Sequence, residues 1–217
     1  MFLTWRTRND GRNLDHPIAE PVVACRGWSS RGVPVTLKNI GGVHQRRGEP
    51  QATLGCYEQA LRIFREVGHR AGEAATLYNF GRVHQRRGDW QAALGCYEQA
   101  LRILREVGDR AGVAATLNNL GGAHYSRGGW QAALDCHEEG LRILREVGDL
   151  AGVAATLNNL GGAHYSRGDW QAALDCHEEA LRILREVGDR AGVAATLNKL
   201  GRVHHRRGEV AGRAWLL

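Results

Sequence analysis

Residues 149–188 read DLAGVAATLNNLGGAHYSRGDWQAALDCHEEALRILREVG, and this 40-residue stretch sets the architecture because it recurs along the chain. Residues 111–150 and 151–190 differ at only three pairs of positions, which are Gly129/Asp169, Gly140/Ala180 and Leu150/Arg190. Earlier residues match the same pattern less closely. Self-similarity at a period of about 20–50 residues is typical of stacked repeat architectures.

The repeat divides the chain into units of equal length. We expect a repeat array over residues 31–208 and non-repeat segments at 1–30 and 209–217, of which 1–30 is predicted to be disordered. Within the array the expected units are 31–70, 71–110, 111–150 and 151–190, followed by the half unit 191–208.

Each unit is predicted to contain two helices bracketed by Gly-Asp. Asp149 and Asp169 can accept hydrogen bonds from the free N–H groups of a first helical turn. Gly168 and Gly188 can adopt the left-handed conformation that ends a helix. The pattern therefore predicts helices over about 151–167 and 170–187.

Both helices of a unit carry an apolar face at three- and four-residue steps, as amphipathic helices do. One helix pair cannot bury both faces alone, so neighbouring units must stack. Gly161 and Gly162 lower helix propensity by about 1 kcal/mol each, which makes sense where another helix approaches closely. The predicted faces are Ala173, His177, Ala180, Leu181 and Leu184 in the second helix, and Ala154, Leu157, Leu160, Gly161 and His164 in the first.

Composition excludes several classes of protein. The longest apolar runs are far shorter than the roughly 20 residues of a membrane-spanning helix, and the first ten residues lack a secretory signal pattern. The chain has 5 cysteines, an odd number, and Cys56, Cys96, Cys136 and Cys176 follow the 40-residue repeat rather than a disulfide framework. We therefore expect a cytoplasmic protein without a membrane partner.

The units resemble the tetratricopeptide repeat (TPR), whose signature is W-x2-L-G-x2-Y followed by A-x3-F. Here Leu117-x2-Leu120-Gly121-x2-His124 is followed by Ala133-x3-His137. The family's Trp is Leu, its Tyr is His, and its final Pro is absent. The 40-residue variety resembles kinesin-light-chain and Pins-type repeats and bacterial signalling arrays. The resemblance implies an all-α, right-handed α-solenoid that binds other proteins, as a scaffold or as the sensor part of a larger bacterial regulator.

In proteins that this chain resembles, the first helix of each unit lines a concave groove. We predict that a protein or peptide segment binds there, with asparagine amides pairing with its backbone and arginines holding its acidic residues. The alternative is that these side chains merely face solvent. The predicted groove residues are Lys38, Arg46, Tyr78, Arg82, Arg86, Asn118, Tyr125, Asn158, Tyr165, Asn198, Arg202 and Arg206.

Catalysis and metal binding have no support in the pattern. The carboxylates recur every 40 residues as solvated helix faces, and no phosphate-binding loop is present. His137 and Cys136 are adjacent on a helix and point about 100° apart, so core packing is favoured over zinc. We predict no enzyme, no cofactor and no metal site. Histidines buried as neutral imidazoles should lower the stability of the protein in mild acid.

The formal charge of +6 is unevenly distributed. Residues 111–150 carry three basic and five acidic side chains, whereas residues 191–217 carry five basic side chains and one acidic. Nucleic-acid binding through the basic ends is thus an alternative from another class, although a continuous basic stripe is more typical of such proteins. A steep fall in affinity with salt would distinguish it.

The end of the chain departs from the repeat. Residues 210–217 read VAGRAWLL where the repeat predicts WQAALGCY, and codons exist that convert one into the other by a one-base shift. We therefore hypothesise a frameshifted piece of a longer TPR protein, or a gene remnant without independent function. The half unit also lacks its second helix, so self-association through this uncapped end is expected.

Overall fold

The computed structural model describes residues 32–47 and 49–207, and these residues form nine α-helices without a strand. The non-repeat segments 1–30 and 209–217 lie outside the described residues. The helices are α1 (Gly32–Arg47), α2 (Pro50–Glu66), α3 (Arg70–Arg86), α4 (Trp90–Val107), α5 (Arg110–Ser126), α6 (Trp130–Val147), α7 (Leu150–Arg167), α8 (Trp170–Glu186) and α9 (Arg190–Arg206).

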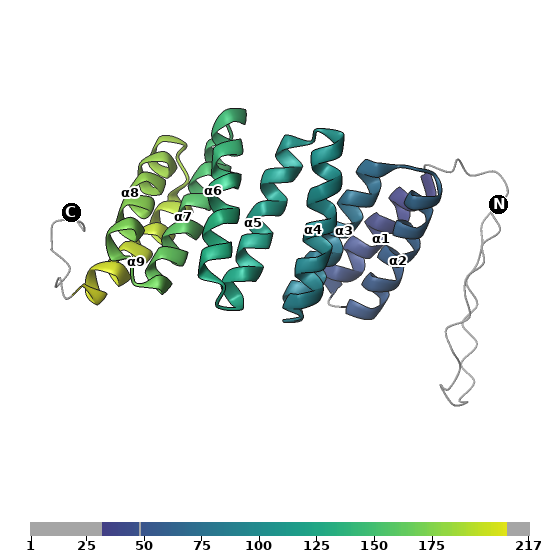
Figure 1. The fold of residues 1–217 in the computed structure, drawn as a ribbon, viewed down its shortest axis with the longest axis horizontal. Helices are drawn as coiled ribbons and strands as arrows, with labels where there is room; N and C mark the ends of the chain where they lie inside the picture. Colours follow the sequence, from purple (N-terminus) through teal and green to yellow (C-terminus); the bar gives the residue numbers. More distant parts are fainter. Residues whose placement is uncertain (1–31, 48, 208–217) are drawn as a thin grey trace, which may run out of the picture.

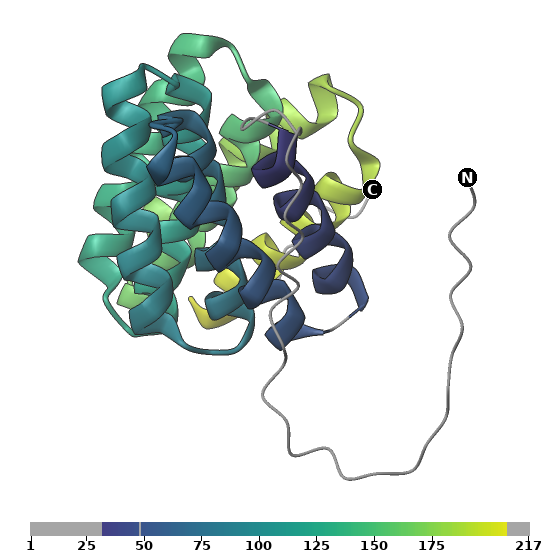
Figure 2. The same ribbon diagram turned by 90° about the vertical axis from the view of Figure 1, so that its right-hand side faces the viewer.

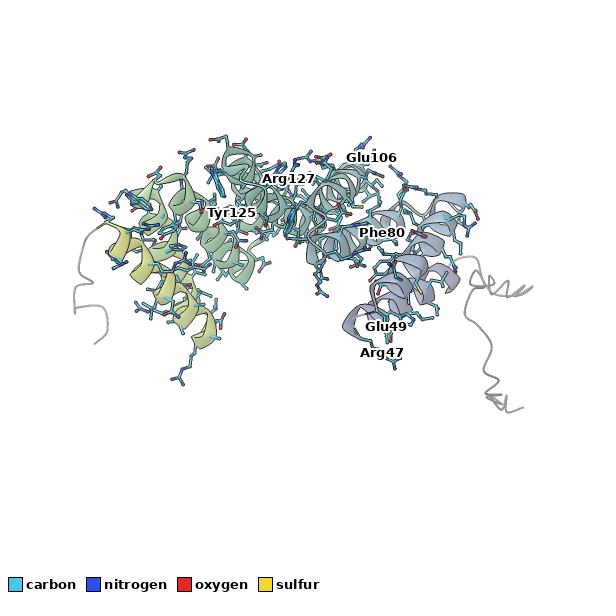
Figure 3. All side chains as sticks on the ribbon, turned by 90° about the horizontal axis from the view of Figure 1, so that it is seen from below. Arg47, Glu49, Phe80, Glu106, Tyr125 and Arg127 are labelled. Atoms are coloured by element: carbon cyan, nitrogen blue, oxygen red, sulfur yellow. The ribbon has the colours of Figure 1, made fainter. Side chains whose placement is uncertain are left out.

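The helices follow one another across the molecule in sequence order (Figure 1). Each packs mainly on the helix before it and the helix after it, and the first helices of neighbouring units also contact one another. Figure 2 views this array nearly end-on, with α1 toward the viewer. Seen from below, the row of helices bends into an arch (Figure 3). This is the predicted all-α repeat solenoid.

The helix boundaries predicted from Gly-Asp are confirmed. The Asp149 carboxylate accepts from the Gly152 backbone N–H at 2.9 Å, and Asp169 accepts from Ala172 at 3.3 Å. Gly168 and Gly188 have φ of 89° and 76°, in the left-handed region where a side chain would be strained. No helix of the described residues is both long and apolar enough to cross a membrane.

The capping carboxylates should be measurable individually. We expect Asp149→Ala to lower the free energy of unfolding by about 1 kcal/mol, because the Gly152 N–H loses its acceptor. Gly129 is the N-cap residue of α6 and has no side chain to cap it, so Gly129→Asp should raise stability by a few tenths of a kcal/mol. Urea unfolding monitored by circular dichroism measures both, and equal effects of the two substitutions would contradict the assignment.

The predicted apolar faces form the core. Ala154, Leu157, Leu160, Ala173 and Leu184 are each at most 6% exposed, whereas His164 is only half-buried. One ring per unit packs on a glycine of the preceding helix, and a Cβ on Gly121 or Gly161 would lie within 2.7 Å of that ring. The rings are Tyr57 on Gly41, Tyr97 on Gly81, His137 on Gly121 and His177 on Gly161.

The two adjacent glycines of each first helix differ in their surroundings. Gly161 is enclosed by the His177 ring, but a Cβ on Gly162 would meet nothing within 4 Å. The expectation that helix packing explains both glycines is therefore correct for Gly161 and wrong for Gly162. Gly162 instead faces the open concave side of the array.

The half unit covers the end of the array only in part. Leu200 and Val203 of α9 are buried against the preceding unit, at 7% and 1% exposure. Val193 and Leu197 are the other large apolar residues of α9, and both remain half-exposed. Their equivalents Val153 and Leu157 are fully buried, because a second helix packs over them.

Candidate groove on the concave side

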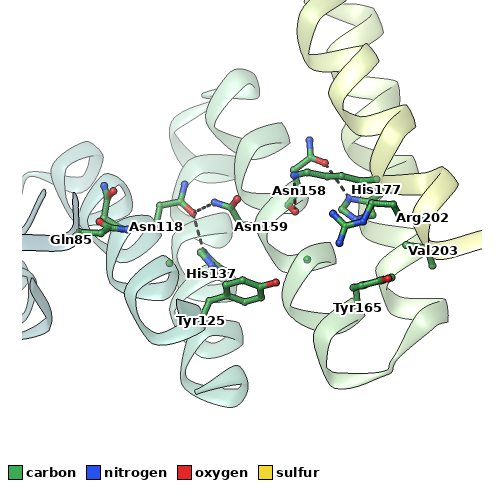
Figure 4. Close-up of a pocket in the computed structure, with 14 residues that line it drawn as sticks. Gln85, Asn118, Tyr125, His137, Asn158, Asn159, Tyr165, His177, Arg202 and Val203 are labelled. Atoms are coloured by element: carbon green, nitrogen blue, oxygen red, sulfur yellow. Dashed lines mark hydrogen bonds between the residues drawn. The ribbon is translucent and has the colours of Figure 1, made fainter. Parts of the chain in front are cut away.

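A cleft of about 400 Å³ runs along the concave side of the array, and we call it the groove (Figure 4). Most of its lining comes from first helices, and two histidines of second helices lie at its base. Within the described part of the chain, no side chain that lines the groove is a carboxylate. The lining residues are Gln85 of α3; Asn118, Asn119, Gly122 and Tyr125 of α5; His137 of α6; Asn158, Asn159, Gly162 and Tyr165 of α7; His177 of α8; and Lys199, Arg202 and Val203 of α9.

A hydrogen-bonded chain at the base of the groove connects neighbouring units. The Thr156 hydroxyl donates to the Gly152 carbonyl at 2.9 Å, so its oxygen accepts from the Asn118 amide nitrogen at 2.8 Å. The Asn118 carbonyl oxygen then faces Nδ1 of His137 at 3.0 Å (Figure 4). His137 therefore carries its proton on Nδ1 and donates it.

The next unit repeats this chain. His177 donates from Nδ1 to the Asn158 oxygen at 3.1 Å, and Asn158 donates to Thr196 at 2.8 Å. Burial lowers the pKa of His137 to about 4. Burial, together with the nearby charges of Lys199 and Arg202, also lowers the pKa of His177 to about 4. Both rings are thus neutral at physiological pH and serve as hydrogen-bond donors.

These contacts change the role expected of Asn118 and Asn158. We expected their amides to pair with the backbone of a bound peptide, but the structure uses them to orient two buried histidines and to join successive first helices. They line the groove while their carbonyl oxygens are already occupied. The amide of Asn159 is more exposed, and its carbonyl oxygen makes no hydrogen bond among the described residues.

Two tyrosines stand along the groove in equivalent positions. The Tyr125 hydroxyl shares a hydrogen bond with Ser166 at 2.8 Å, and its ring packs edge-on against Trp130. Tyr165 packs in the same way against Trp170. Because each ring is held by a tryptophan, the pair offers rigid, flat apolar area with a polar tip to a ligand.

The C-terminal end of the groove is basic. Arg202 lies 5.2 Å from the centre of the Tyr165 ring, and Arg206 donates to the Tyr165 hydroxyl at 3.3 Å. The hydrogen bond from Arg206 lowers the pKa of Tyr165. Lys199 donates to the Asn158 backbone oxygen at 3.3 Å, and burial lowers its pKa. An anion in the groove would offset that cost of burying the Lys199 charge.

The other predicted groove residues lie at various distances from this cleft. Tyr78 accepts from Asn119 at 3.0 Å, and Arg82 lies 5.9 Å from the Tyr78 ring centre, so both lie beside the groove without lining the cleft. Arg86 and Asn198 are exposed and do not line the cleft. The side chains of Lys38 and Arg46 lie outside the described residues.

Lys199 was missed in the sequence, although a signal was present. The equivalent positions in the preceding units hold Asn79, Asn119 and Asn159, so Lys199 breaks an otherwise uniform row. Gln85 is another lining residue that is not among the predicted groove residues. It lines the cleft and accepts from the Tyr97 hydroxyl at 2.7 Å.

The histidines and cysteines do not gather into a site. No group of three or more potential ligands within the described residues is placed to hold a metal ion. Burial raises the pKa of Cys136 and Cys176 to about 11, which keeps both thiols protonated and poorly nucleophilic.

Several solved structures are similar to this chain. BtubC (BKLC) from P. vanneervenii has 25% sequence identity and a TM-score of 0.74, with 81% of this chain and 73% of that chain covered. A putative kinesin light chain from Podosopora anserina with nearly identical TPR-like repeats has 19% identity and a TM-score of 0.70, covering 81% and 87%. RapI has 18% identity and a TM-score of 0.74, with 83% of this chain and 50% of that chain covered.

No curated protein sequence matches the chain. The family model of the tetratricopeptide repeat matches residues 33–106, 75–146 and 152–211, which together cover most of the array. The fold, the ring-on-glycine packing and this match agree, and the chain belongs to the tetratricopeptide repeat family.

Proposed function

We propose that this protein is a non-enzymatic, cytoplasmic interaction module that binds an acidic protein segment in its groove. TPR arrays are protein-interaction scaffolds in general, and this chain shares their architecture. The observation that carries the proposal is the lining of the groove, which includes Lys199 and Arg202 and no carboxylate. Association with a larger bacterial signalling regulator is part of the same proposal.

The remaining groove features suit an extended peptide. Gly122 and Gly162 leave the floor open, and a Cβ at position 162 would meet none of the described residues within 4 Å. Each glycine lowers helix stability by about 1 kcal/mol relative to alanine, so close approach of a ligand gives these positions a purpose. The Tyr125 and Tyr165 rings then offer apolar contact on either side of the open floor.

Peptide arrays of fixed length and graded net charge test the proposal. We expect acidic peptides to be retained and neutral or basic ones to be lost. The double variant Lys199→Asn/Arg206→Ser copies Asn159 and Ser166 of the preceding unit, so it removes two charges with residues the fold already accommodates. It should weaken binding of the retained peptides about tenfold, as loss of charge-assisted contacts does.

A matched control removes charge elsewhere. Arg182→Gln and Arg102→Gln alter exposed arginines of α8 and α4 that do not line the groove, and affinity should stay unchanged. Equal retention of basic and acidic peptides would overturn the proposal. So would binding of single-stranded nucleic acid that falls steeply with salt, since that result favours phosphate recognition by the basic ends.

A further inference from the structure

Among the described residues, α9 leaves a second surface uncovered, and its lining differs from that of the groove. A depression of about 390 Å³ lies between α8 and α9, and we call it the end face. Its apolar part consists of Leu184, Val193, Ala194 and Leu197. Two arginines, Arg185 and Arg190, border these apolar side chains.

The interior of the array shows what covers the same surface elsewhere. Gly140 of α6 packs against α5. A Cβ placed on Gly140 would lie 3.6 Å from the Ala114 backbone oxygen and 3.6 Å from the Leu117 Cβ. Ala114 and Ala154 are completely buried. Ala194, their equivalent in α9, is exposed. The end face is therefore a copy of the surface on which a second helix packs in every complete unit.

The arginines extend the correspondence to charge. Arg105 of α4 donates to Glu139 of α6 at 2.7 Å, and Arg145 of α6 donates in the same way to Glu179 of α8. Arg185 is the next member of this series, and it forms no ion pair among the described residues.

A second series joins the beginning of a first helix to the end of a second helix. Arg70 pairs with Glu106, and Arg110 pairs with Glu146. Arg190 is the equivalent residue of α9, and within the described part of the chain it too has no carboxylate partner. In α6 the two partner residues, Glu139 and Glu146, lie seven residues apart, which places them on one side of a helix.

We propose that the end face binds, in trans, an amphipathic α-helix that carries two carboxylates seven residues apart beside a stripe of alanine and leucine. Residues 208–217 of this chain contain one carboxylate, Glu209, and cannot supply such a pair. In a second copy, α2, α4, α6 and α8 are already packed in their own array. Two end faces in contact would bring the arginines of both copies together.

The probe is a labelled synthetic peptide with the sequence of residues 169–188, bearing Cys176→Ser to prevent oxidation. It contains Glu179 and Glu186 seven residues apart and the Ala173, Leu174 and Leu181 stripe. Fluorescence anisotropy with the full chain should show saturable one-to-one binding. Arg185→Glu/Arg190→Glu should weaken it more than tenfold, and a peptide with Glu179→Arg/Glu186→Arg should regain affinity for that variant.

Three controls locate the contact. Arg62→Glu/Arg102→Glu changes the net charge equally on the exposed surfaces of α2 and α4 and should leave affinity unchanged. Lys199→Asn/Arg206→Ser should also have no effect, which separates this surface from the groove. Binding that depends on Arg145 rather than Arg185 would mean that the peptide displaces α8, and it would overturn the proposal. The absence of saturable binding would overturn it as well.

Discussion

Gly161→Ala is expected to lower the free energy of unfolding by about 2 kcal/mol, whereas Gly162→Ala raises it by about 1 kcal/mol. A Cβ on Gly161 would lie 2.5 Å from the His177 ring, and that ring is 2% exposed and hydrogen-bonded to Asn158. The ring therefore cannot move aside without losing packing or its acceptor. A Cβ on Gly162 meets open space, so only the gain in helix propensity remains.

Urea unfolding of the two variants, followed by circular dichroism, gives the comparison. A second test combines Gly161→Ala with His177→Ala, which removes the ring and should make the two substitutions strongly non-additive. Similar stability of the two glycine variants would show that the ring does not constrain Gly161. The same contrast is expected between Gly121 and Gly122, because the His137 ring lies against Gly121 alone.

Mild acid is expected to destabilise the protein by roughly 3 kcal/mol between pH 7.5 and pH 5.5. His137 and His177 have pKa values of about 4 in the folded protein, below their ordinary value near 6.5. The unfolded chain therefore binds more protons as the pH falls through 6.5. The stabilisation that comes from these neutral histidines is fully present above that value and declines toward pH 4. Each histidine contributes about 1.4 kcal/mol of the loss at pH 5.5.

Thermal and urea unfolding at the two pH values measure the loss, and NMR titration of the imidazole protons identifies its source. The ordinary pKa of a carboxylic acid lies near 4, below this interval, so histidines are the expected source of the change. Two imidazoles should remain neutral well below pH 6. Ordinary titration of every histidine near pH 6.5, or an unchanged unfolding midpoint, would contradict the burial of neutral rings.

The helices were predictable because residues close to each helix end determine where the helix begins and ends. Asp149 and Gly168 act on backbone groups within a few residues of themselves, so no knowledge of tertiary structure is needed to place the helix between them. Because the unit recurs, the same inference about helix ends applies to all four complete units. Leu157 and Ala173 likewise follow the period of their own helix, which is why the core was predictable as well.

The separate roles of the two glycines and the two asparagine rows were not predictable. Gly161 and Gly162 are neighbours in one helix, and only the position of the His177 ring on the next helix distinguishes them. Asn158 and Asn159 differ in the same way, since Asn158 reaches Thr196 in the following unit. Such distinctions depend on the rotation of one helix against another, which the period of a single helix does not define.

The sequence also did not identify Lys199 as a groove residue. It replaces Asn159 of the preceding unit, and in the sequence this exchange resembles ordinary variation at a surface position. The structure brings it beside Arg202 at one end of the groove and half-buries it. Comparison of the units shows that Lys199 is unusual. Its place in the groove depends on the curvature of the array, which brings the first helices together on one side.

The ring that packs on glycine changes identity halfway along the array. Tyr57 and Tyr97 occupy this position in the first two units, and His137 and His177 occupy it in the next two. Tyrosine does not gain a proton in mild acid, so we expect acid to loosen α5–α8 more than α1–α4. Because repeat arrays can lose structure unit by unit, acidification should produce a half-folded intermediate before complete unfolding. A partner held along the whole concave side would then lose its C-terminal contacts first and remain tethered through α3.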